Sequence, residues 1–391
     1  MQDFKTLMKT GKLDGDGEEG DIYLIQELAA GLRKERFRNE AIAAADPLGA
    51  DDAMLRLPAL NAGKDVERIK EALGVAVQRA QCLPEADFVD CSAAIRDISI
   101  FGGSLVRLGI EPADCVPDFS QALLRLSADV DAQIPRDSFI DYTARNPGGT
   151  RERRFTSLPQ EGIFIDSLRR GMIALDTCLD DIMSGYAYPF ASRECAEHYS
   201  SAAESFQMMI DSIVQVKREI TPEIFTHHIR PFFEPFNVGG RAYSAPSGAE
   251  MSVLNIDQII WGADCEDEVY VTYFRANMPR LPVIYSQISE AFAGQKPLVT
   301  LLKDRLRSGC ALGPDERRTV QMLHHFLNRV YAFRMAHYRV AEANVTLRLQ
   351  ESGGDNEVKG SSGFGLLETK YVLDQIIRCR QITSQALSLE G

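Results

Sequence analysis

Residues 315–350, DERRTVQMLHHFLNRVYAFRMAHYRVAEANVTLRLQ, carry the pattern that decides the fold of this chain. Apolar side chains recur at steps of three and four residues, which places them on one side of a long helix: Val320, Leu323, Leu327, Val330 and Ala341. Arg334 and His337 fall on that same side. Because a guanidinium cannot lose its proton, burying Arg334 without an anion costs several kcal/mol. We therefore expect a negatively charged group beside this helix.

Two interpretations fit Arg334 and His337. In the first, the helix borders a haem, whose iron is bound by the imidazole of His337 and whose propionate pairs with Arg334. In the second, both residues are structural: His337 is a satisfied core histidine, and Arg334 extends to solvent or pairs with a buried acid. For this helix taken alone, the structural interpretation is the simpler one.

The composition excludes some classes of function. The 391 residues carry a net charge of −13, whereas binding to nucleic acid requires a basic surface. No apolar run approaches the roughly 18–20 residues of a membrane span, and the N-terminus lacks the apolar core of a secretory signal. We expect a soluble, cytoplasmic protein that binds neither nucleic acid nor a membrane.

The spacing of cysteine and histidine argues against a zinc enzyme. Eight cysteines are scattered without a CxxC pair, which is typical of buried, reduced thiols. No two of the six histidines have the spacing of three or four residues that binds zinc on one helix.

The periodicity is helical along nearly the whole chain, without a convincing run of alternating strand residues. The predicted helices cover residues 36–46, 51–59, 64–81, 86–108, 117–131, 161–185, 191–219, 221–234, 248–262, 266–294, 297–308, 314–350 and 363–388. We predict an N-terminal appendage (1–35), a small helical domain (36–150) and a larger helical domain (151–391), divided at a polar, arginine-bearing loop. The glycine- and serine-rich residues 351–365 are either a flexible surface connection or a lid.

Asp257 supplies the expected negative charge. Val253, Leu254, Ile260 and Trp261 flank it on adjacent turns, so its carboxylate should be buried and must be paired. Asp257 and Arg334 are thus two buried charges of opposite sign on different predicted helices. We expect them to form an ion pair.

Arg230 is the third unusual charge, in the aromatic stretch IFTHHIRPFFEPF. Such a stretch can form a wall for a flat organic ligand, and an arginine beside it commonly binds a carboxylate through two hydrogen bonds. The alternative is a solvated arginine at a helix end that Pro231 distorts.

Two further segments give weaker signals. Phe164 and Ser167 are three residues apart on a predicted helix, where they suit either a ligand pocket or ordinary core packing. Gly360-Ser361-Ser362-Gly363 precedes the last helix, and its backbone N–H groups and hydroxyls could bind an oxygen-rich ligand.

The order of these motifs resembles the indoleamine 2,3-dioxygenase superfamily, and most closely its monodechloroaminopyrrolnitrin synthase branch. The resemblance lies in LNRVYAFRMAHYRVAE, then a glycine-rich gap, then GSSGFGLLETKYVLDQI, and upstream in RPFFEPFNVGGRAYSAPSGAEMSVLNIDQIIWG. It extends from about Phe37 to the C-terminus and includes ADPLGADDAMLRLPALNAGKDV and FTSLPQEG.

The resemblance implies a haem b enzyme and assigns roles to individual residues. His337 would be the proximal iron ligand, and Arg334, backed by Asp257, would bind a haem propionate. Arg230 would bind the substrate carboxylate and act in catalysis with Ser167 and Ser361. The remaining assignments are Phe164, Gly248 and Ala249 at the cofactor, and Phe225, Ile163, Ser361 and Ser362 at the substrate.

The sequence also departs from the family patterns. No histidine lies near Phe164, so a distal-histidine mechanism like that of the tryptophan 2,3-dioxygenases has no candidate residue. Gly-Ser-Ser-Gly replaces the Gly-Ser-Gly-Gly of the synthase branch, and Asp166 places a carboxylate just before Ser167. Because the distal pocket decides which reaction a haem performs, the cofactor follows more directly from the resemblance than the reaction does.

We therefore expect an all-α fold in two parts, with haem b between helices of the larger domain. The expected function is oxidation or oxidative rearrangement of tryptophan, or of a related and even chlorinated indole amino acid, by O2 or peroxide. The alternatives are a haem-binding redox or gas sensor without turnover, and a helical interaction protein without a cofactor. The oligomeric state is left open, a homo-oligomer included.

Overall fold

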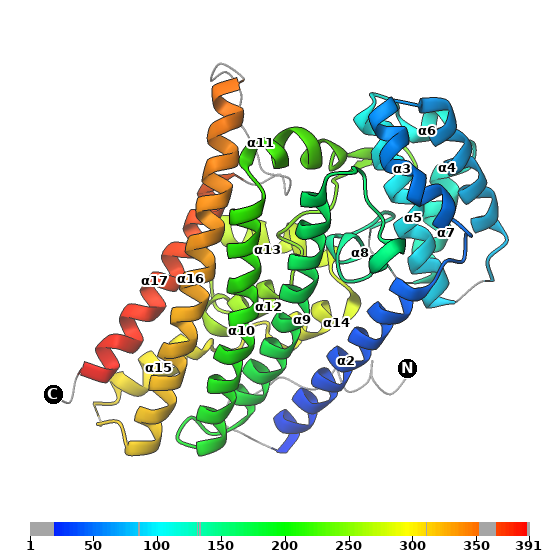
Figure 1. The fold of residues 1–391 in the computed structure, drawn as a ribbon. Coiled ribbons are helices and arrows are strands. Elements are labelled where there is room, and N and C mark those ends of the chain that lie inside the picture. The colour runs from blue at the N-terminus through cyan, green and yellow to red at the C-terminus, as the bar shows by residue number, and fades with distance from the viewer. Residues whose placement is uncertain are drawn as a thin grey trace.

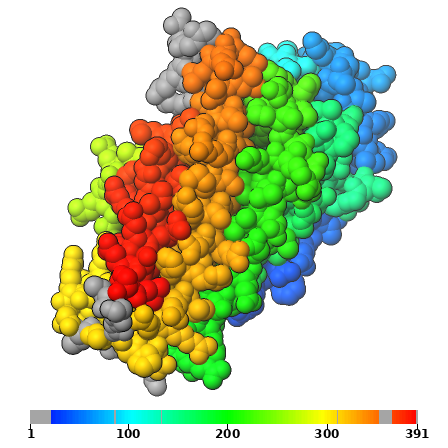
Figure 2. Space-filling view, turned by 60° about the vertical axis from the view of Figure 1, so that its left-hand side comes forward, coloured from blue at the N-terminus to red at the C-terminus, as the bar shows by residue number. Residues whose placement is uncertain are grey.

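The computed structural model describes residues 19–84, 87–130, 132, 134–309, 311–351 and 365–388, and it is all-α apart from one short hairpin. Four long helices pack in sequence order: α9 (Pro159–Ala187), α10 (Arg193–Glu219), α16 (Pro314–Glu351) and α17 (Leu366–Ser388). They run side by side in Figure 1, and α16 and α17 cover one face of the molecule in Figure 2. Among the described helices, none is long and apolar enough to cross a membrane.

The N-terminal helices form the other end of the molecule, except that the first of them runs from there along α9 (Figure 1). They are α2 (Glu19–Ala44), α3 (Asp51–Gly63), α4 (Val66–Gln81), α5 (Phe88–Arg107), α6 (Pro112–Cys115) and α7 (Phe119–Asp129). The predicted boundary between residues 35 and 36 falls inside α2, which packs against both α5 and α9. Buried apolar side chains form one continuous core from Leu24 in α2 to Cys379 in α17.

α5 is buried on all sides, which explains its paired glycines. Every residue from Cys91 to Leu105 is buried. A Cβ atom on Gly103 would lie 2.9 Å from the carbonyl oxygen of Phe232, and one on Gly102 would lie 3.3 Å from the ring of Phe236. The two glycines thus allow the segment that contains Phe232 and Phe236 to pass close to α5.

Several predicted helices are shorter or interrupted. The predicted helix 221–234 consists of α11 (Pro222–Ile224), the wide turn η2 (Phe225–Ile229) and the tight turn η3 (Arg230–Phe232). The predicted 248–262 is α12 (Val253–Asp257) followed by the wide turn η4 (Gln258–Gly262). The predicted 266–294 is broken near Pro279 and Pro282 into α13 (Glu268–Asn277), η5 (Met278–Arg280) and α14 (Val283–Phe292), because proline cannot donate the helical hydrogen bond.

The sequence pattern missed one hairpin, and the remaining elements are short. Strands β1 (Phe236–Val238) and β2 (Arg241–Tyr243) pair antiparallel around Gly239-Gly240, with Phe236 opposite Tyr243. Both glycines have positive φ, as such a turn requires. The other elements are α8 (Phe139–Tyr142), η1 (Gly149–Arg151) and α15 (Leu298–Arg307).

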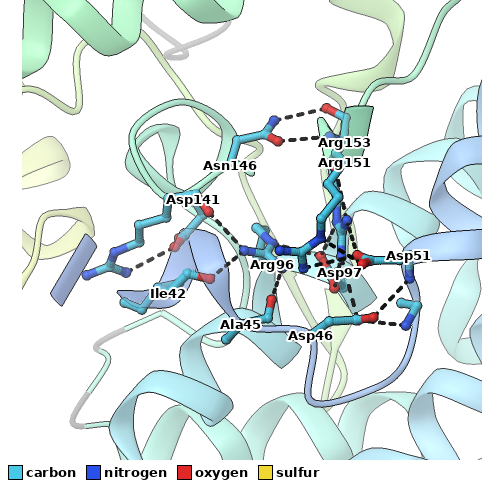
Figure 3. A network of polar contacts seen from close by, with 12 residues as sticks. Ile42, Ala45, Asp46, Asp51, Arg96, Asp97, Asp141, Asn146, Arg151 and Arg153 are labelled. Carbon is cyan, nitrogen blue, oxygen red and sulfur yellow. Dashed lines mark hydrogen bonds and ion pairs between the residues drawn. The ribbon is translucent and has the colours of Figure 1, made fainter. Parts of the chain in front are cut away.

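A buried ion-pair network joins the N-terminal helices to the loop before α9 (Figure 3). Asp97 accepts hydrogen bonds from Arg96 and Arg153, at 2.7 and 3.2 Å, and all three side chains are excluded from solvent. Burial raises the pKa of Asp97, but the two arginines outweigh this effect and hold that pKa below its usual value. Arg153 also pairs with Asp51 at 2.5 Å, and Arg96 donates to the carbonyl oxygen of Ile42. The network thus joins α2, α3 and α5 to residues 145–153.

Candidate functional site

A cavity lies beside α16, between α9, α10, the segment 220–253 and the start of α17. Its wall is mainly apolar and includes Phe164 and Leu168 of α9, Met209 and Ile213 of α10, and Val340 of α16. The centre of a water molecule can occupy ≈ 210 Å³ of it, whereas holding one water needs only about 10–15 Å³. The cavity therefore has room for an organic ligand.

Arg334 and His337 both line this cavity, one helical turn apart on α16. Asp257 lies behind Arg334, forms an ion pair with its Nη2 and is completely buried. The two predicted charges therefore meet, as expected. Burial raises the pKa of Asp257, and the positive charge of Arg334 opposes that rise.

His337 is available as a ligand. Its ring stacks on Phe333, with centroids 5.9 Å apart and planes inclined by 7°. Burial, helped by the positive charge of Arg334, lowers the pKa of His337 to about 4, so the imidazole is neutral near pH 7. Neutral imidazole is the form that binds a metal.

Three buried polar atoms at this end have no hydrogen-bond partner among the described residues: His337 Nδ1, Arg334 Nε and Asp257 Oδ1. Unpaired buried polar atoms are costly and mark places where a ligand or water is missing. An imidazole on the wall of an apolar cavity, with an anchored guanidinium one turn away, fits the iron and the propionate of a haem.

Residues 246–249 form another part of the wall, and a buried ion pair with its hydrogen bonds holds the neighbouring backbone in place. Gly248 and Ala249 both line the cavity, and a Cβ atom on Gly248 would meet nothing within 4 Å. Behind them, Glu250 forms an ion pair with Arg280 and accepts a hydrogen bond from Phe139 N at 2.8 Å. Arg280 also donates to the carbonyl oxygens of Ser244 and Ala245. The backbone at Gly248 therefore leaves open space for a bulky planar group.

Aromatic rings form the end of the cavity nearest η2. Phe225 and Phe164 both line it, and their ring centroids are 5.6 Å apart. Phe233 also lines it and packs edge-on against Tyr142 at 4.9 Å. This is the aromatic wall that the sequence predicted around Arg230.

Arg230 lines the cavity at this aromatic end. Its Nη1 pairs with Glu234 at 2.7 Å, whereas its Nε is buried and has no hydrogen-bond partner among the described residues. The sequence left open whether Arg230 is solvated or binds a ligand. Among the described residues, Arg230 therefore has one ion-pair partner, Glu234, and one donor, Nε, that is not used.

Besides Asp257, which lies behind the wall, two of the described site residues that the sequence predicted do not line the cavity. Ile163 and Ser167 lie on α9, but the face toward the cavity is that of Phe164 and Leu168, and successive helical residues are about 100° apart. Ser167 is fully buried, and Ile163 is half-buried. Ser361 and Ser362 lie outside the described residues.

The sequence analysis missed cavity residues near the C-terminal end of α16. Asn344 and Arg348 line the cavity, as does Tyr273 of α13. Arg348 follows His337 by 11 residues, about three helical turns, so it continues the same side of the helix. That spacing was the available signal, but polar residues such as Asn344 and Glu351 interrupt the apolar side of the helix there.

A comparison with known families finds a match that covers most of the chain. Residues 39–301, about two thirds of the chain, match the family monodechloroaminopyrrolnitrin synthase PrnB. The chain belongs to this family. The resemblance and the all-α fold expected from the sequence are both confirmed. The matched range of the PrnB family contains Phe225, Arg230 and Asp257 and ends before α16.

Proposed function

We propose that this protein is a haem b-dependent oxidoreductase that acts on tryptophan or a related indole amino acid. Membership of the monodechloroaminopyrrolnitrin synthase family supports an oxidative reaction on a tryptophan-derived substrate. The observation that carries the proposal is the placement of His337 and Arg334 on the wall of one apolar cavity, with Asp257 behind Arg334.

Four residues would hold the cofactor. The imidazole of His337 binds the iron, and Arg334, fixed in place by Asp257, pairs with a propionate. Gly248 provides the open space beside the macrocycle. When bound, the haem supplies the iron centre that activates O2 or peroxide for attack on the indole ring.

The substrate would lie at the aromatic end of the cavity. Phe225 and Phe164 pack against the indole and exclude water from it. Arg230 binds the carboxylate of the amino acid, for which its buried Nε is a donor that no described residue uses, and keeps the ring within reacting distance. The resemblance to the synthase branch favours a chlorinated tryptophan derivative as substrate and an oxidative rearrangement with decarboxylation as the reaction, in place of simple insertion of O2.

The test compares L-tryptophan with tryptamine, which has no carboxylate, in the haem-loaded protein and its Arg230→Ala variant. A charge-assisted hydrogen bond contributes roughly 1.5–3 kcal/mol. The variant should therefore bind tryptophan about tenfold to a few hundredfold more weakly, with unchanged haem content and unchanged tryptamine binding. Titration of the Soret band measures both ligands, and chromatography detects the products.

Each outcome has one meaning. Equal weakening for both ligands would make Arg230 a structural residue. A spectral response to tryptophan without product under O2 or peroxide would favour a redox or gas sensor. Absence of a Soret band from protein supplied with haem would leave a helical interaction protein without cofactor.

A further inference from the structure

Arg348 lies on the same cavity wall as His337 but has no role in the proposed function so far. Side chains on a helix lean toward its N-terminus, so the guanidinium of Arg348 is directed back along α16 toward Asn344. Both residues line the cavity. This places a positive charge toward the end of the cavity opposite to that of Arg334.

Arg348 and Arg230 approach the same end of the cavity from different elements. Burial lowers the pKa of Arg348, and the positive charge of Arg230 lowers it further, while Glu234 opposes both effects. Such an influence requires the three side chains to be neighbours. A hydrogen bond of 3.4 Å from Thr226 Oγ1 to Asn344 Oδ1 also joins η2 to α16 here.

Two guanidinium groups beside a mainly apolar wall indicate the charge of the ligand. Like charges repel, and burial strengthens that repulsion. An anion that accepts hydrogen bonds from both arginines relieves it, and the buried Nε of Arg230 is a donor that no described residue uses. The aromatic and aliphatic wall beside them suits the rest of an organic acid.

We propose that Arg348 acts with Arg230 as a two-arginine site for the carboxylate of the substrate, and so restricts the enzyme to free amino acids. The inference rests on the proposed function for the identity of the ligand. Amines, amides and esters with the same ring system carry no negative charge for the two arginines to attract, and they should bind poorly.

The test uses Arg348→Gln, Arg348→Lys and the control Arg339→Ala. Arg339 lies on the same helix and carries the same charge, but it is exposed and pairs with Glu342. Binding of L-tryptophan, L-tryptophan amide and tryptamine is measured by calorimetry in the haem-loaded proteins, and haem content is measured by absorbance.

Arg348→Gln should bind tryptophan about tenfold to a hundredfold more weakly, while tryptophan amide and tryptamine bind as they do to the wild type. Arg348→Lys keeps the charge and should recover part of the loss, and Arg339→Ala should resemble the wild type. In a double variant with Arg230→Ala, the two losses should be non-additive, because both residues contact one group.

Three results would overturn the role of Arg348: undiminished tryptophan binding in Arg348→Gln, equal weakening for all three ligands, or loss of haem. The last would assign Arg348 to the cofactor or to the fold. A wild-type protein that binds haem but none of the three ligands would refute the carboxylate site. A wild-type protein that binds tryptophan but no haem would refute the proposed cofactor. The role of Arg348 could then still be tested by the same calorimetry.

Discussion

Arg334 and Asp257 form an ion pair that connects the core to the cavity wall. Removing two charges from water is costly, so such a buried pair adds little net stability compared with apolar residues of similar size. Its role is one of position, because Asp257 holds a guanidinium where an anionic ligand group can reach it. Among the described residues, Arg334 Nε and Asp257 Oδ1 have no hydrogen-bond partner.

The pair predicts a specific pattern of stability. Replacing either residue with alanine leaves the other charge buried, which costs about 3–5 kcal/mol and should lower haem retention as well. The loss of stability in the double variant should be markedly smaller than the sum of the two single losses. Chemical denaturation of the four proteins measures this. Alanine at the exposed pair Arg193–Glu197 is the control and should change stability by less than about 1 kcal/mol. Additive losses at Asp257 and Arg334 would show that the two do not interact.

The sequence predicted these positions because each is a charge on an apolar face. Arg334, His337, Asp257 and Arg230 all follow from that single criterion, and the structure brings them to one cavity or directly behind its wall. The same criterion fails for Arg348, because the polar residues Asn344 and Glu351 lie one turn away on its side of the helix.

At the scale of elements, α5 depends on its close approach to η3, whose last residue is Phe232. A Cβ at Gly103 would lie 2.9 Å from a backbone oxygen, which cannot move without moving that segment. Gly103→Ala should therefore destabilise the protein by about 1–3 kcal/mol. Gly74→Ala in α4 is the control, because a Cβ atom there meets nothing within 4 Å. The higher helix propensity of alanine should make this variant more stable than the wild type by up to about 1 kcal/mol. Thermal unfolding compares the two variants, and equal changes in stability would contradict the close approach of α5 and η3.

The contact between α9 and α14 should make stability depend on pH. Burial raises the pKa of Asp176 to about 7, although hydroxyl groups of Ser252 and Tyr285 oppose the rise. Both carboxylate oxygens of Asp176 lie 2.9 Å from Tyr285 Oη. The folded protein therefore favours protonated Asp176. The stability that this preference contributes is fully present below the unfolded pKa of 3.8, and it is lost as the pH rises from there to about 7.

Asp176→Asn removes that charge and keeps the acceptor for Tyr285. Since each pKa unit is worth about 1.4 kcal/mol, the variant should be more stable than the wild type by several kcal/mol at pH 8 and nearly equal to it at pH 4. Denaturant unfolding across this range provides the measurement, with exposed Asp52→Asn as the control. A stability difference that does not vary with pH would refute the assignment.

Helical periodicity predicted the long elements better than the short ones. Helices such as α10 and α16 differ from the predicted ranges by at most two residues at either end, because they repeat one pattern over many turns. The segment 221–262 was predicted as two helices but forms wide turns, tight turns and a hairpin, which depend on local hydrogen bonds and on packing around the cavity. The irregular part is thus also the part that forms much of the site.

At the scale of the whole molecule, the chain is joined by contacts that periodicity cannot reveal. In the buried ion-pair network, Arg153 bonds to Asp97 across 56 positions and to Asp51 across 102, and Arg145 pairs with Glu35 across 110. The one-dimensional pattern shows each of these as an ordinary charged residue. The continuous core from α2 to α17 likewise follows from three-dimensional packing. The division into an appendage and two domains stays a prediction.

The central claim is that His337 is the protein ligand of a haem in the cavity. The most direct test is the optical spectrum of wild-type protein, His337→Ala and His325→Ala, each supplied with haem, freed of excess and recorded with and without L-tryptophan. His325 is the matched control because it is exposed on the same helix. We predict one haem per chain, with a Soret band that shifts on addition of tryptophan, in the wild type and His325→Ala, and no stoichiometric haem in His337→Ala. A normal haem spectrum in His337→Ala, or no bound haem in the wild type, would contradict the claim.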